Sequence, residues 1–306
     1  MTLKGKQNHY NVKFLKGFGF SIKVKDSKIV LTNTAYPYAI TQIPDLSDGR
    51  WIKRKTIHKD AKVGFFRIRA KIPDCKYILP FPFRTKHDIV FPSGEFETYV
   101  TLQELLVCEK SFYKILEGYQ FIPNSNSYPY AGFISKLYQK RLELKQQNNP
   151  LQLPIKIILN SIYGKTGQVI EHNIGNMFNP VIFAFITGFV RAQLYSFVKK
   201  YGLEKEVVFF ATDSICTRNK LKIDSAKLGD FSFDGMGDDV FVLQNGFYRL
   251  SDTDLSLLEK ADNGESEFCL GIIIQYYHGR NTASFFLITK YLPDLQKFKT
   301  IHEWNE

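Results

Sequence analysis

Alternating apolar and polar residues predict strands at the beginning of the chain. Phe20, Ile22 and Val24 are separated by polar residues, and a period of two is typical of a half-buried strand. We therefore expect residues 1–43 to form strands, followed by turns as far as residue 60.

Strand-like segments return further along the chain. The segments 63–72 and 77–83 are rich in apolar residues at strand spacing, and Pro-Ser-Gly at 92–94 predicts a hairpin turn. Near the C-terminus, 271–277 and 283–289 also have a strand-like composition. Together these segments indicate a substantial β content.

Helical signals begin with a capping box. Thr101 is followed three residues later by Glu104, a pair whose side chains can bond each other's backbone N–H groups at a helix N-terminus. We expect a helix from Thr101 to about residue 116. A long helix is expected over 180–201, and Gly202 ends it.

Two further helices lie between these signals. Residues 132–147 and about 153–163 are helical in pattern, and Gln-Asn-Asn-Pro separates them. Two antiparallel helices with a short connection form a projecting arm. After the long helix, a short buried strand at 207–210 is expected to turn through Thr212 and Asp213 into a second strand.

The composition is that of a globular protein with a basic surface. Of 306 residues, 44% are hydrophobic and 23% are charged, and the formal net charge is +11 with a pI of about 9.3. A basic surface favours polyanions, nucleic acid first and an anionic membrane second. Aromatic residues reach 15%; most belong in a core, and some could stack on bases.

Several sequence features argue against secretion and membrane insertion. Cys75, Cys108, Cys216 and Cys269 lack metal-binding spacing, and we interpret them as buried thiols in a reducing compartment. The N-terminus has no apolar signal region, and the longest apolar stretch, 180–190, is too short to cross a bilayer. We expect a cytoplasmic protein with no membrane partner.

The strongest chemical signal is the segment KIILNSIYGKTG at 156–167. On a helix, Lys156, Asn160 and Tyr163 occupy one face at i, i+4 and i+7. A cation, an amide and an aromatic ring on one stripe suit a triphosphate, a sugar or base edge, and a stacked base. From periodicity alone, an amphipathic helix with these residues by chance is the simpler interpretation.

The order K-x-x-x-N-S-x-Y-G in this segment closely resembles the fingers motif of family B DNA polymerases, especially the protein-primed members of viruses and linear plasmids. The resemblance implies that Lys156 contacts the phosphates of an incoming nucleotide. It implies that Asn160 and Tyr163 shape the pocket for the nucleotide and the nascent base pair.

Other segments resemble the same family in the same order. TAYP at 34–37 and FFATDS at 209–214 are similar to palm motifs, ITGFVR at 186–191 to the helix after the fingers, and 245–248 to the primer-terminus motif. Tyr36 takes the place of a tyrosine that packs under the sugar in the family, although core packing explains it equally well. The resemblance implies contacts with DNA from Lys165, Thr187, Arg191 and Tyr248.

The resemblance also implies a fold and a domain organisation. The fold is α+β: an antiparallel palm sheet with packed helices, a helical-hairpin fingers element and a small thumb-like C-terminal region. The resemblance spans roughly 10–250. The palm would comprise 1–131 and 169–250, the fingers 132–168, and the thumb-like extension 251–306. This leaves no room upstream for the exonuclease domain that usually precedes such a palm.

The catalytic motifs depart from the family pattern where chemistry depends on them. Polymerisation in the family uses two divalent ions, Mg²⁺ in an active enzyme, held between palm aspartates. Leu31 and Ala211 occupy two positions where the family has Asp, Gly246 occupies one where it has Lys, and only Asp213 remains. One carboxylate cannot bridge two hard cations that each need several oxygen ligands.

A nearby acid could replace the lost ones, and Asp26 and Asp88 are the candidates. Asp26, however, lies five residues before Leu31, too far along a strand to substitute for it without a change of register. Leu31 and Ala211 also fit buried strands that need no function, and they remove carboxylate repulsion from a site without metal. We predict a degenerate centre with little polymerase activity.

Three functions stay open on the sequence. The first is a catalytically degenerate polymerase relative, from a virus or mobile element, that binds primer–template DNA or docks on an active polymerase or another replication protein. The second is an active DNA polymerase that uses Asp213 with acids at other positions. The third is a structural or interaction protein that keeps the palm fold and binds no nucleic acid. Salt-dependent DNA binding weakened by Lys156→Ala and Arg191→Ala separates the first from the third.

Overall fold

The protein combines two larger sheets and two two-stranded sheets with five α-helices in the part of the chain that the structure describes, so the α+β class is confirmed. The computed structural model describes residues 11–15, 19–32, 34–74, 78–85, 89–170, 173–218, 223, 225–244 and 247–249. The chain divides into two compact units. Unit 1 comprises Met1–Val30, Glu206–Lys222 and Phe233–Glu306, and unit 2 comprises Leu31–Lys205 and Ile223–Ser232.

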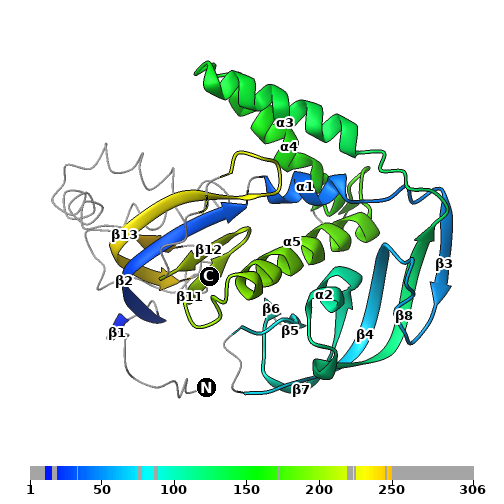
Figure 1. The fold of residues 1–306 in the computed structure, drawn as a ribbon, viewed down its shortest axis with the longest axis horizontal. Helices are drawn as coiled ribbons and strands as arrows, with labels where there is room; N and C mark the ends of the chain where they lie inside the picture. Colours follow the sequence, from blue (N-terminus) through cyan, green and yellow to red (C-terminus); the bar gives the residue numbers. More distant parts are fainter. Residues whose placement is uncertain are drawn as a thin grey trace. The chain divides into compact units, whose positions relative to one another are not determined.

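Unit 1 contains most of a six-stranded sheet with the order β11-β12-β2-β13-β14, and β1 pairs with β2 (Figure 1). The strands are β1 (Asn11–Leu15), β2 (Gly19–Thr32), β11 (Val207–Ala211), β12 (Ser214–Thr217), β13 (Phe231–Gln244) and β14 (Phe247–Arg249). The strands expected at 271–277 and 283–289, and the thumb-like region, lie outside the described residues.

The β11–β12 hairpin forms as the sequence predicts. Ala211 pairs with Ser214, so Thr212 and Asp213 make a two-residue turn. Thr212 has a φ of 58°, which is rare for a β-branched residue and costs roughly 1–3 kcal/mol. Backbone strain of this kind clusters at functional sites, and here it falls in a segment that resembles a palm motif.

The sheet of unit 2 has four antiparallel strands in the order β3-β8-β4-β7. They are β3 (Gly49–Lys53), β4 (Val63–Ile72), β7 (Gly94–Thr101) and β8 (Tyr113–Pro123). From Phe66 to Ile72, every second residue of β4 is buried and the intervening ones are exposed. The buried face packs against α2 (Leu102–Val107) in one apolar core (Figure 1). On the opposite face, Arg67, Arg69 and Lys71 of β4 are exposed, whereas Val63 and Phe121, which pair at one end of the sheet, are buried.

Three strand predictions need correction. β3 lies within the stretch expected to be turns, because an edge strand with exposed residues shows no apolar alternation. Only the last residue of the segment 77–83, Phe83, lies in a strand among the described residues. The turn at 92–94 does not join paired strands: β6 (Ile89–Val90) pairs with β5 (Phe83–Arg84), and β7 pairs with β4.

Helix α1 (Ala35–Thr41) occupies a segment for which the sequence predicts a strand. Ala35, Pro37 and Ala39 are buried, and this spacing imitates the alternation of a strand. The helix is too short and too buried to display an amphipathic period. Thr34, before the helix, has a φ of 54°, and the Arg141 Nη1 group donates to its hydroxyl at 3.4 Å.

The capping box at Thr101 is confirmed, but the helix that it starts is shorter than predicted. The Glu104 N–H donates to Thr101 Oγ1, and the Thr101 N–H donates to Glu104 Oε2 at 2.8 Å. Helix α2 ends at Val107 and not near residue 116; a 3-10 turn (Lys110–Phe112) then leads into β8. Pairing of β8 with β3 and β4 decides the structure here, because tertiary contacts override weak local propensity.

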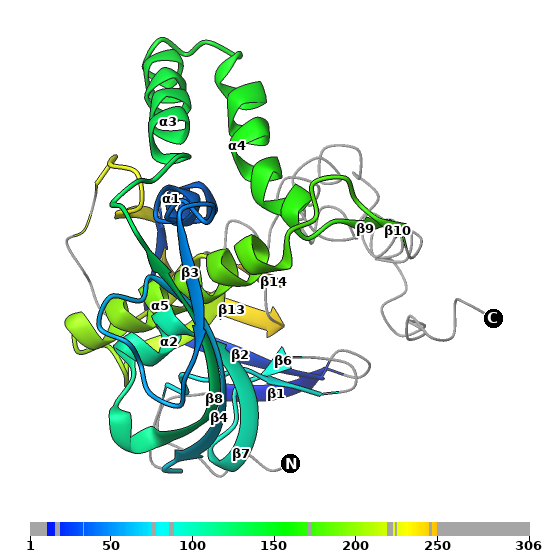
Figure 2. The same cartoon turned by 90° about the vertical axis from the view of Figure 1, so that its right-hand side faces the viewer.

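The predicted helical hairpin is present and projects from the rest of unit 2 (Figure 2). It consists of α3 (Ala131–Gln146) and α4 (Gln152–Thr166). Tyr138 anchors α3, because its hydroxyl donates to the Ala226 carbonyl at 2.7 Å. A small hairpin, β9 (Val169–Ile170) with β10 (Asn173–Ile174), follows α4.

Helix α5 (Pro180–Lys200) is the long apolar helix that the sequence predicts, and Gly202 follows it with a φ of 62°. It continues past residue 190 and is long and apolar enough to cross a membrane, so the argument from length is wrong. Half of its apolar window is buried, and it packs on α1, α2 and α4. These contacts account for its apolar surface as that of a core helix.

Candidate nucleic-acid interface

Helix α4 carries the predicted polar stripe. Lys156 and Asn160 are exposed, and Tyr163 is half-buried. The fold does not depend on the packing of two exposed side chains, so the charge of Lys156 and the amide of Asn160 are available to a ligand. Lys165 lies nine residues after Lys156 and therefore points to about the opposite side of the helix.

Tyr163 lies at the centre of a stack of three aromatic rings from three helices. The ring centroids of Tyr36 on α1 and Tyr163 are 4.4 Å apart at an interplanar angle of 16°. The ring of Phe183 on α5 follows at 5.0 Å and 5°. Gly167 makes room for the stack, because a Cβ there would collide with the Phe183 ring. The rings fix the base of α4 against α1 and α5.

Arg191 on α5 is held by a buried carboxylate. The Arg191 Nε group donates to Glu104 Oε1 at 2.7 Å, and the Glu104 side chain is 2% exposed. The other oxygen of Glu104 accepts from the hydroxyl of Thr101 at 2.9 Å. Gly188 permits this approach, since a Cβ there would collide with the Thr101 side chain. The capping glutamate is thus also the counter-ion of a predicted DNA-binding arginine.

The charge of Arg191 reaches the aromatic stack. Partial burial raises the pKa of the Tyr163 hydroxyl, and the positive charge of Arg191 opposes this rise. The Arg191 side chain remains 32% exposed, so Glu104 does not bury the whole guanidinium. Arg191 therefore combines a structural ion pair with a positive group beside Tyr163.

Two other predicted contacts are engaged within the protein. The Lys165 ammonium donates to Gln168 Oε1 at 3.0 Å. The Thr187 hydroxyl donates to the carbonyls of Phe183 and Ala184, at 3.1 and 3.0 Å. The Lys165 ammonium keeps two further N–H donors, whereas the single hydroxyl proton of Thr187 is shared by the two carbonyls. Their role in DNA binding stays a prediction.

The palm positions do not fit a centre of two metal ions. Leu31 is the second-to-last residue of β2, Ala211 ends β11, and Asp213 is half-buried in the turn that follows. Leucine and alanine side chains supply no oxygen ligand. Among the described residues, no group of three or more His, Cys, Asp or Glu side chains is placed to hold a metal ion.

The other palm residues of the prediction are placed by the strands that carry them. Strand β12 lies beside β2 in the sheet order, so the Asp213 turn and the strand of Leu31 belong to one sheet. Asp26 is also on β2, five residues before Leu31. Tyr248 lies on β14 opposite Val242. Asp88 and Gly246 lie outside the described residues.

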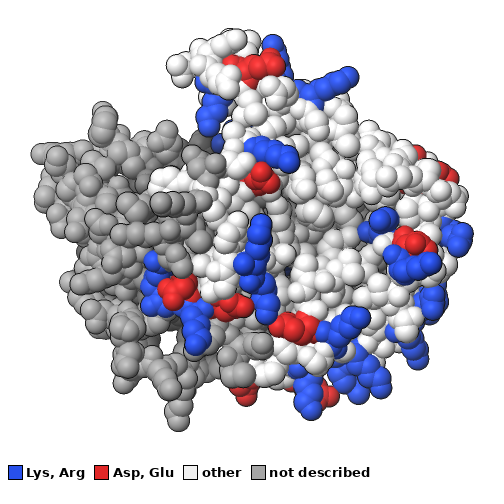
Figure 3. All heavy atoms as spheres, viewed as in Figure 1, with Lys and Arg blue, Asp and Glu red and all other residues white. Residues whose placement is uncertain are grey.

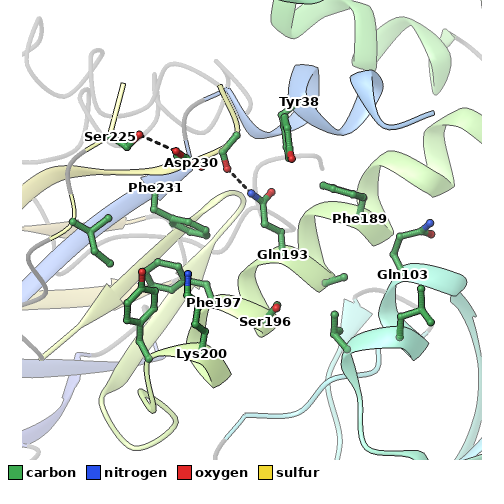
Figure 4. A pocket seen from close by; sticks show the side chains of 16 residues that line it. Tyr38, Gln103, Phe189, Gln193, Ser196, Phe197, Lys200, Ser225, Asp230 and Phe231 are labelled. Carbon is green, nitrogen blue, oxygen red and sulfur yellow. Dashed lines mark hydrogen bonds between the residues drawn. The ribbon is translucent and has the colours of Figure 1, made fainter. Parts of the chain in front are cut away.

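Unit 2 also has an open cavity of about 600 Å³ that contains none of the predicted site residues (Figure 4). Tyr38 of α1, Phe189 of α5 and Phe231 line it with aromatic rings. The Gln193 Nε2 group donates to the Gly229 carbonyl, and the Gln193 Oε1 atom is buried without a hydrogen-bond partner. The cavity and the ring stack thus use different residues of the same two helices.

The chain is similar to known DNA polymerases. Residues 29–227 match the family described as DNA polymerase type B, organellar and viral. The DNA polymerase of Acidianus bottle-shaped virus (isolate Italy/Pozzuoli) is 31% identical over 178 residues, which cover 56% of this chain and 26% of that protein. The chain therefore spans about a quarter of the length of this relative.

Solved structures of phi29 DNA polymerase share the fold. An orthorhombic crystal form has a TM-score of 0.57 and 16% identity, covering 74% of this chain and 46% of that one. A ternary complex with primer–template DNA and incoming nucleotides has a TM-score of 0.54 and 16% identity, with the same coverage. The family resemblance predicted from the motifs is confirmed.

The structure adds two residues that the motifs do not identify. Phe183 completes the ring stack, and Glu104 binds Arg191 from 87 positions away. No local pattern links Phe183 to Tyr163, because the contact joins two helices. Glu104 carries a local signal, the capping box, but that signal does not indicate its distant partner.

Proposed function

The chain belongs to the organellar and viral type B DNA polymerases, and within this family we infer that it is a catalytically degenerate relative that binds primer–template DNA. One contrast carries the inference. The exposed pair Lys156 and Asn160 suits a nucleic-acid ligand, whereas apolar residues stand at two of the three palm carboxylate positions.

The binding role rests on the chemistry of the helical arm and its neighbours. Lys156 would contact phosphate, Asn160 a sugar or base edge, and the Tyr163 ring a base pair. Arg191 adds a positive group beside Tyr163. The polymerase of phi29, which shares this fold, has been solved with primer–template DNA and incoming nucleotides. The net charge of +11 favours such a partner.

The loss of catalysis rests on ligand count. Asp213 is one carboxylate, and each hard cation needs several oxygen ligands. Removing a single group that stabilises charge in a transition state typically costs about 10²-fold or more in rate. Leu31 and Ala211 together would therefore leave little template-dependent synthesis. We assign no metal-dependent step to this protein.

Docking on an active polymerase or another replication protein is the second candidate, and exposed apolar residues favour it. They lie on α4, on the small hairpin after it and in the turn that follows the hairpin: Leu153, Ile157, Ile158, Val169, Ile170, Ile174 and Met177. Exposed apolar residues that form a contiguous patch mark protein contacts. Such docking is compatible with DNA binding by the polar stripe.

A binding assay tests the first role. Fluorescence anisotropy with a labelled primer–template should show an affinity that falls with salt, because phosphate contacts release counterions. Lys156→Ala should weaken binding several-fold and reduce the salt slope by about 1. Lys136→Ala, which removes an exposed lysine of α3, is the matched control. Equal affinity of all three proteins would remove the arm from the DNA site.

An extension assay tests the inferred loss of catalysis. With the same primer–template, dNTPs and Mg²⁺ or Mn²⁺, the protein should add no nucleotides above background. Template-dependent extension that Asp213→Asn abolishes would show an active polymerase with a rearranged site. Absence of any DNA binding together with an intact fold would instead support a purely structural or interaction role.

A further inference from the structure

The solvent-facing side of the β3-β8-β4-β7 sheet carries a group of exposed aromatic rings. Tyr99 on β7 is 74% exposed, Tyr119 on β8 is 47% exposed, and Trp51 on β3 is 44% exposed. Phe65 on β4 lies between them and stacks on Trp51, with ring centroids 6.3 Å apart. Such rings on a sheet face remain outside the core, which lies on the opposite face with Phe66 and its neighbours.

Strand register places these rings and several charges in adjacent rows of one face. One row contains Lys53, Tyr119 and Phe65, and the next contains Tyr99, Arg67 and Glu117. The following rows pair Arg69 with Glu97 and Lys114, and Lys71 with Glu95. The alternation of exposed and buried residues along β4 confirms that its arginines share the outer face.

Cations outnumber anions on this face. It has five basic side chains, Lys53, Arg67, Arg69, Lys71 and Lys114, and three acidic ones, Glu95, Glu97 and Glu117. In Figure 3, Lys and Arg gather over this part of unit 2 with a few acidic groups among them.

Part of this charge is paired and part is available. Glu97 receives both Arg67 and Arg69, at 2.7 and 2.8 Å. Lys71 and Lys114 have no acidic side chain within ion-pair distance in the described part of the chain. Cross-strand ion pairs are ordinary on an exposed sheet face, but they account neither for these two lysines nor for the exposed rings.

We propose that this face is a second nucleic-acid site, which binds a single strand by stacking bases on Tyr99, Tyr119 and Trp51 and by pairing phosphates with Lys71 and Lys114. Aromatic rings on an open sheet, with cations beside them, are the arrangement by which proteins hold unpaired bases. The rings cannot reach bases inside a duplex. The excess of cations favours a polyanion over a protein partner.

The spacing of the rings agrees with an extended strand. Neighbouring strands lie about 4.8 Å apart and rows about 6.7 Å apart, so Tyr99 and Tyr119 are roughly 12 Å from each other. Bases stacked on one another are closer than this, so each ring would receive a base that is splayed from its neighbours. The site does not depend on the arm, and it stands whether or not α4 binds DNA.

Anisotropy with a labelled oligothymidylate of about 16 nucleotides tests the proposal. Tyr99→Ala and Tyr119→Ala should each weaken binding on the order of 10-fold, and Tyr99→Phe should bind like the wild type because it keeps the ring. Lys71→Gln with Lys114→Gln should reduce the salt slope. Lys136→Ala, which removes an exposed lysine of α3 away from the sheet, should leave this affinity unchanged.

A second measurement follows the sheet directly. The chain has two tryptophans, Trp51 and Trp304, so in a Trp304→Phe protein the emission reports on Trp51 alone. Quenching by the oligothymidylate, abolished by Tyr99→Ala with Tyr119→Ala, is the expected result. Unchanged affinity of that double variant, or binding without quenching, would overturn the proposal. A duplex that competes as well as the single strand would also overturn it.

Discussion

The helical arm and the palm hairpin carry two parts of one family pattern, and they differ in what supports their residues. On α4, Tyr163 is packed in a ring stack while Lys156 and Asn160 are exposed. In the β11–β12 hairpin, the turn keeps the positive φ of Thr212, but Ala211 stands where the family has a carboxylate.

The difference shows which residues can report on function. Tyr163 and Arg191 have structural partners, so the fold alone would explain them. Clustered carboxylates without metal repel one another and destabilise the fold. The palm here avoids this repulsion, because Leu31 and Ala211 are uncharged. The fold does not explain Lys156 and Asn160, because both side chains are exposed. These two residues therefore distinguish a nucleic-acid-binding protein from one that only keeps the fold.

The largest effect should come from restoring the palm carboxylates. Leu31→Asp together with Ala211→Asp should raise template-dependent extension in Mg²⁺ by about 10²-fold or more, because each group stabilises charge in the transition state. Each single substitution should give far less, since two ions need both. A primer-extension time course measures the change.

A control at Asp213 tests whether the gain comes from the restored metal centre. Adding Asp213→Asn to the double variant should abolish the gain, because the restored centre requires all three carboxylates. If the double variant folds and binds DNA but does not extend a primer, the palm has lost more than its acids.

Breaking the ion pair at Arg191 should give the next largest effect. Arg191→Met leaves the Glu104 carboxyl group 2% exposed and without its cationic partner, which should reduce the free energy of unfolding by about 3 kcal/mol. Adding Glu104→Gln should recover part of the loss, since glutamine is uncharged and still completes a capping box. Urea unfolding measures the free energy of unfolding of the wild type, of Arg191→Met and of the double variant.

The exposed Lys165 provides a matched control for that cycle. It is a cation bonded to an uncharged amide, so Lys165→Met should change stability by less than about 0.5 kcal/mol. An Arg191→Met protein as stable as the wild type would show that the ion pair with Glu104 does not stabilise the fold.

Removing the central ring should have a smaller effect. Tyr163 is half-buried between Tyr36 and Phe183, and Tyr163→Ala should cost roughly 2 kcal/mol through lost packing. Tyr163→Phe keeps the stack and should cost little in stability. If Tyr163→Phe nonetheless weakens primer–template binding, the hydroxyl itself contacts the ligand. Thermal unfolding measures the change in stability, and fluorescence anisotropy measures the change in primer–template affinity.

Local signals predicted helices α2 to α5 and the β11–β12 hairpin, whereas α1 and most strand pairings depend on contacts between distant segments. The capping box located the start of α2, but its end depended on β8 joining a sheet with β3 and β4. The buried residues of α1 imitated a strand. For the site, periodicity placed Lys156, Asn160 and Tyr163 on one face, yet the contacts of Phe183 and Glu104 join distant segments and leave no local trace.

The smallest expected effect compares two ion pairs on the same helix. The second ion pair on α5 joins Lys199 to Glu109. The Glu109 carboxylate accepts from Lys199 at 2.9 Å and from the Tyr195 hydroxyl at 3.2 Å. Partial burial raises the pKa of Glu109, but the hydrogen bond from Lys199 and the other interactions outweigh it, so the pKa is lowered overall. At 32% exposure the pair is partly screened and should contribute at most about 1 kcal/mol.

A depressed carboxyl pKa fixes the pH range of this contribution. The stabilisation is present above the unfolded value near 4.5 and disappears as the pH falls through the lower folded value. Glu109→Gln should therefore be less stable than the wild type at pH 7, and the difference should shrink at acid pH, when Glu109 is protonated. Urea midpoints across this range measure it. A constant difference at all pH values would mean that packing, and not charge, holds Glu109 against α5.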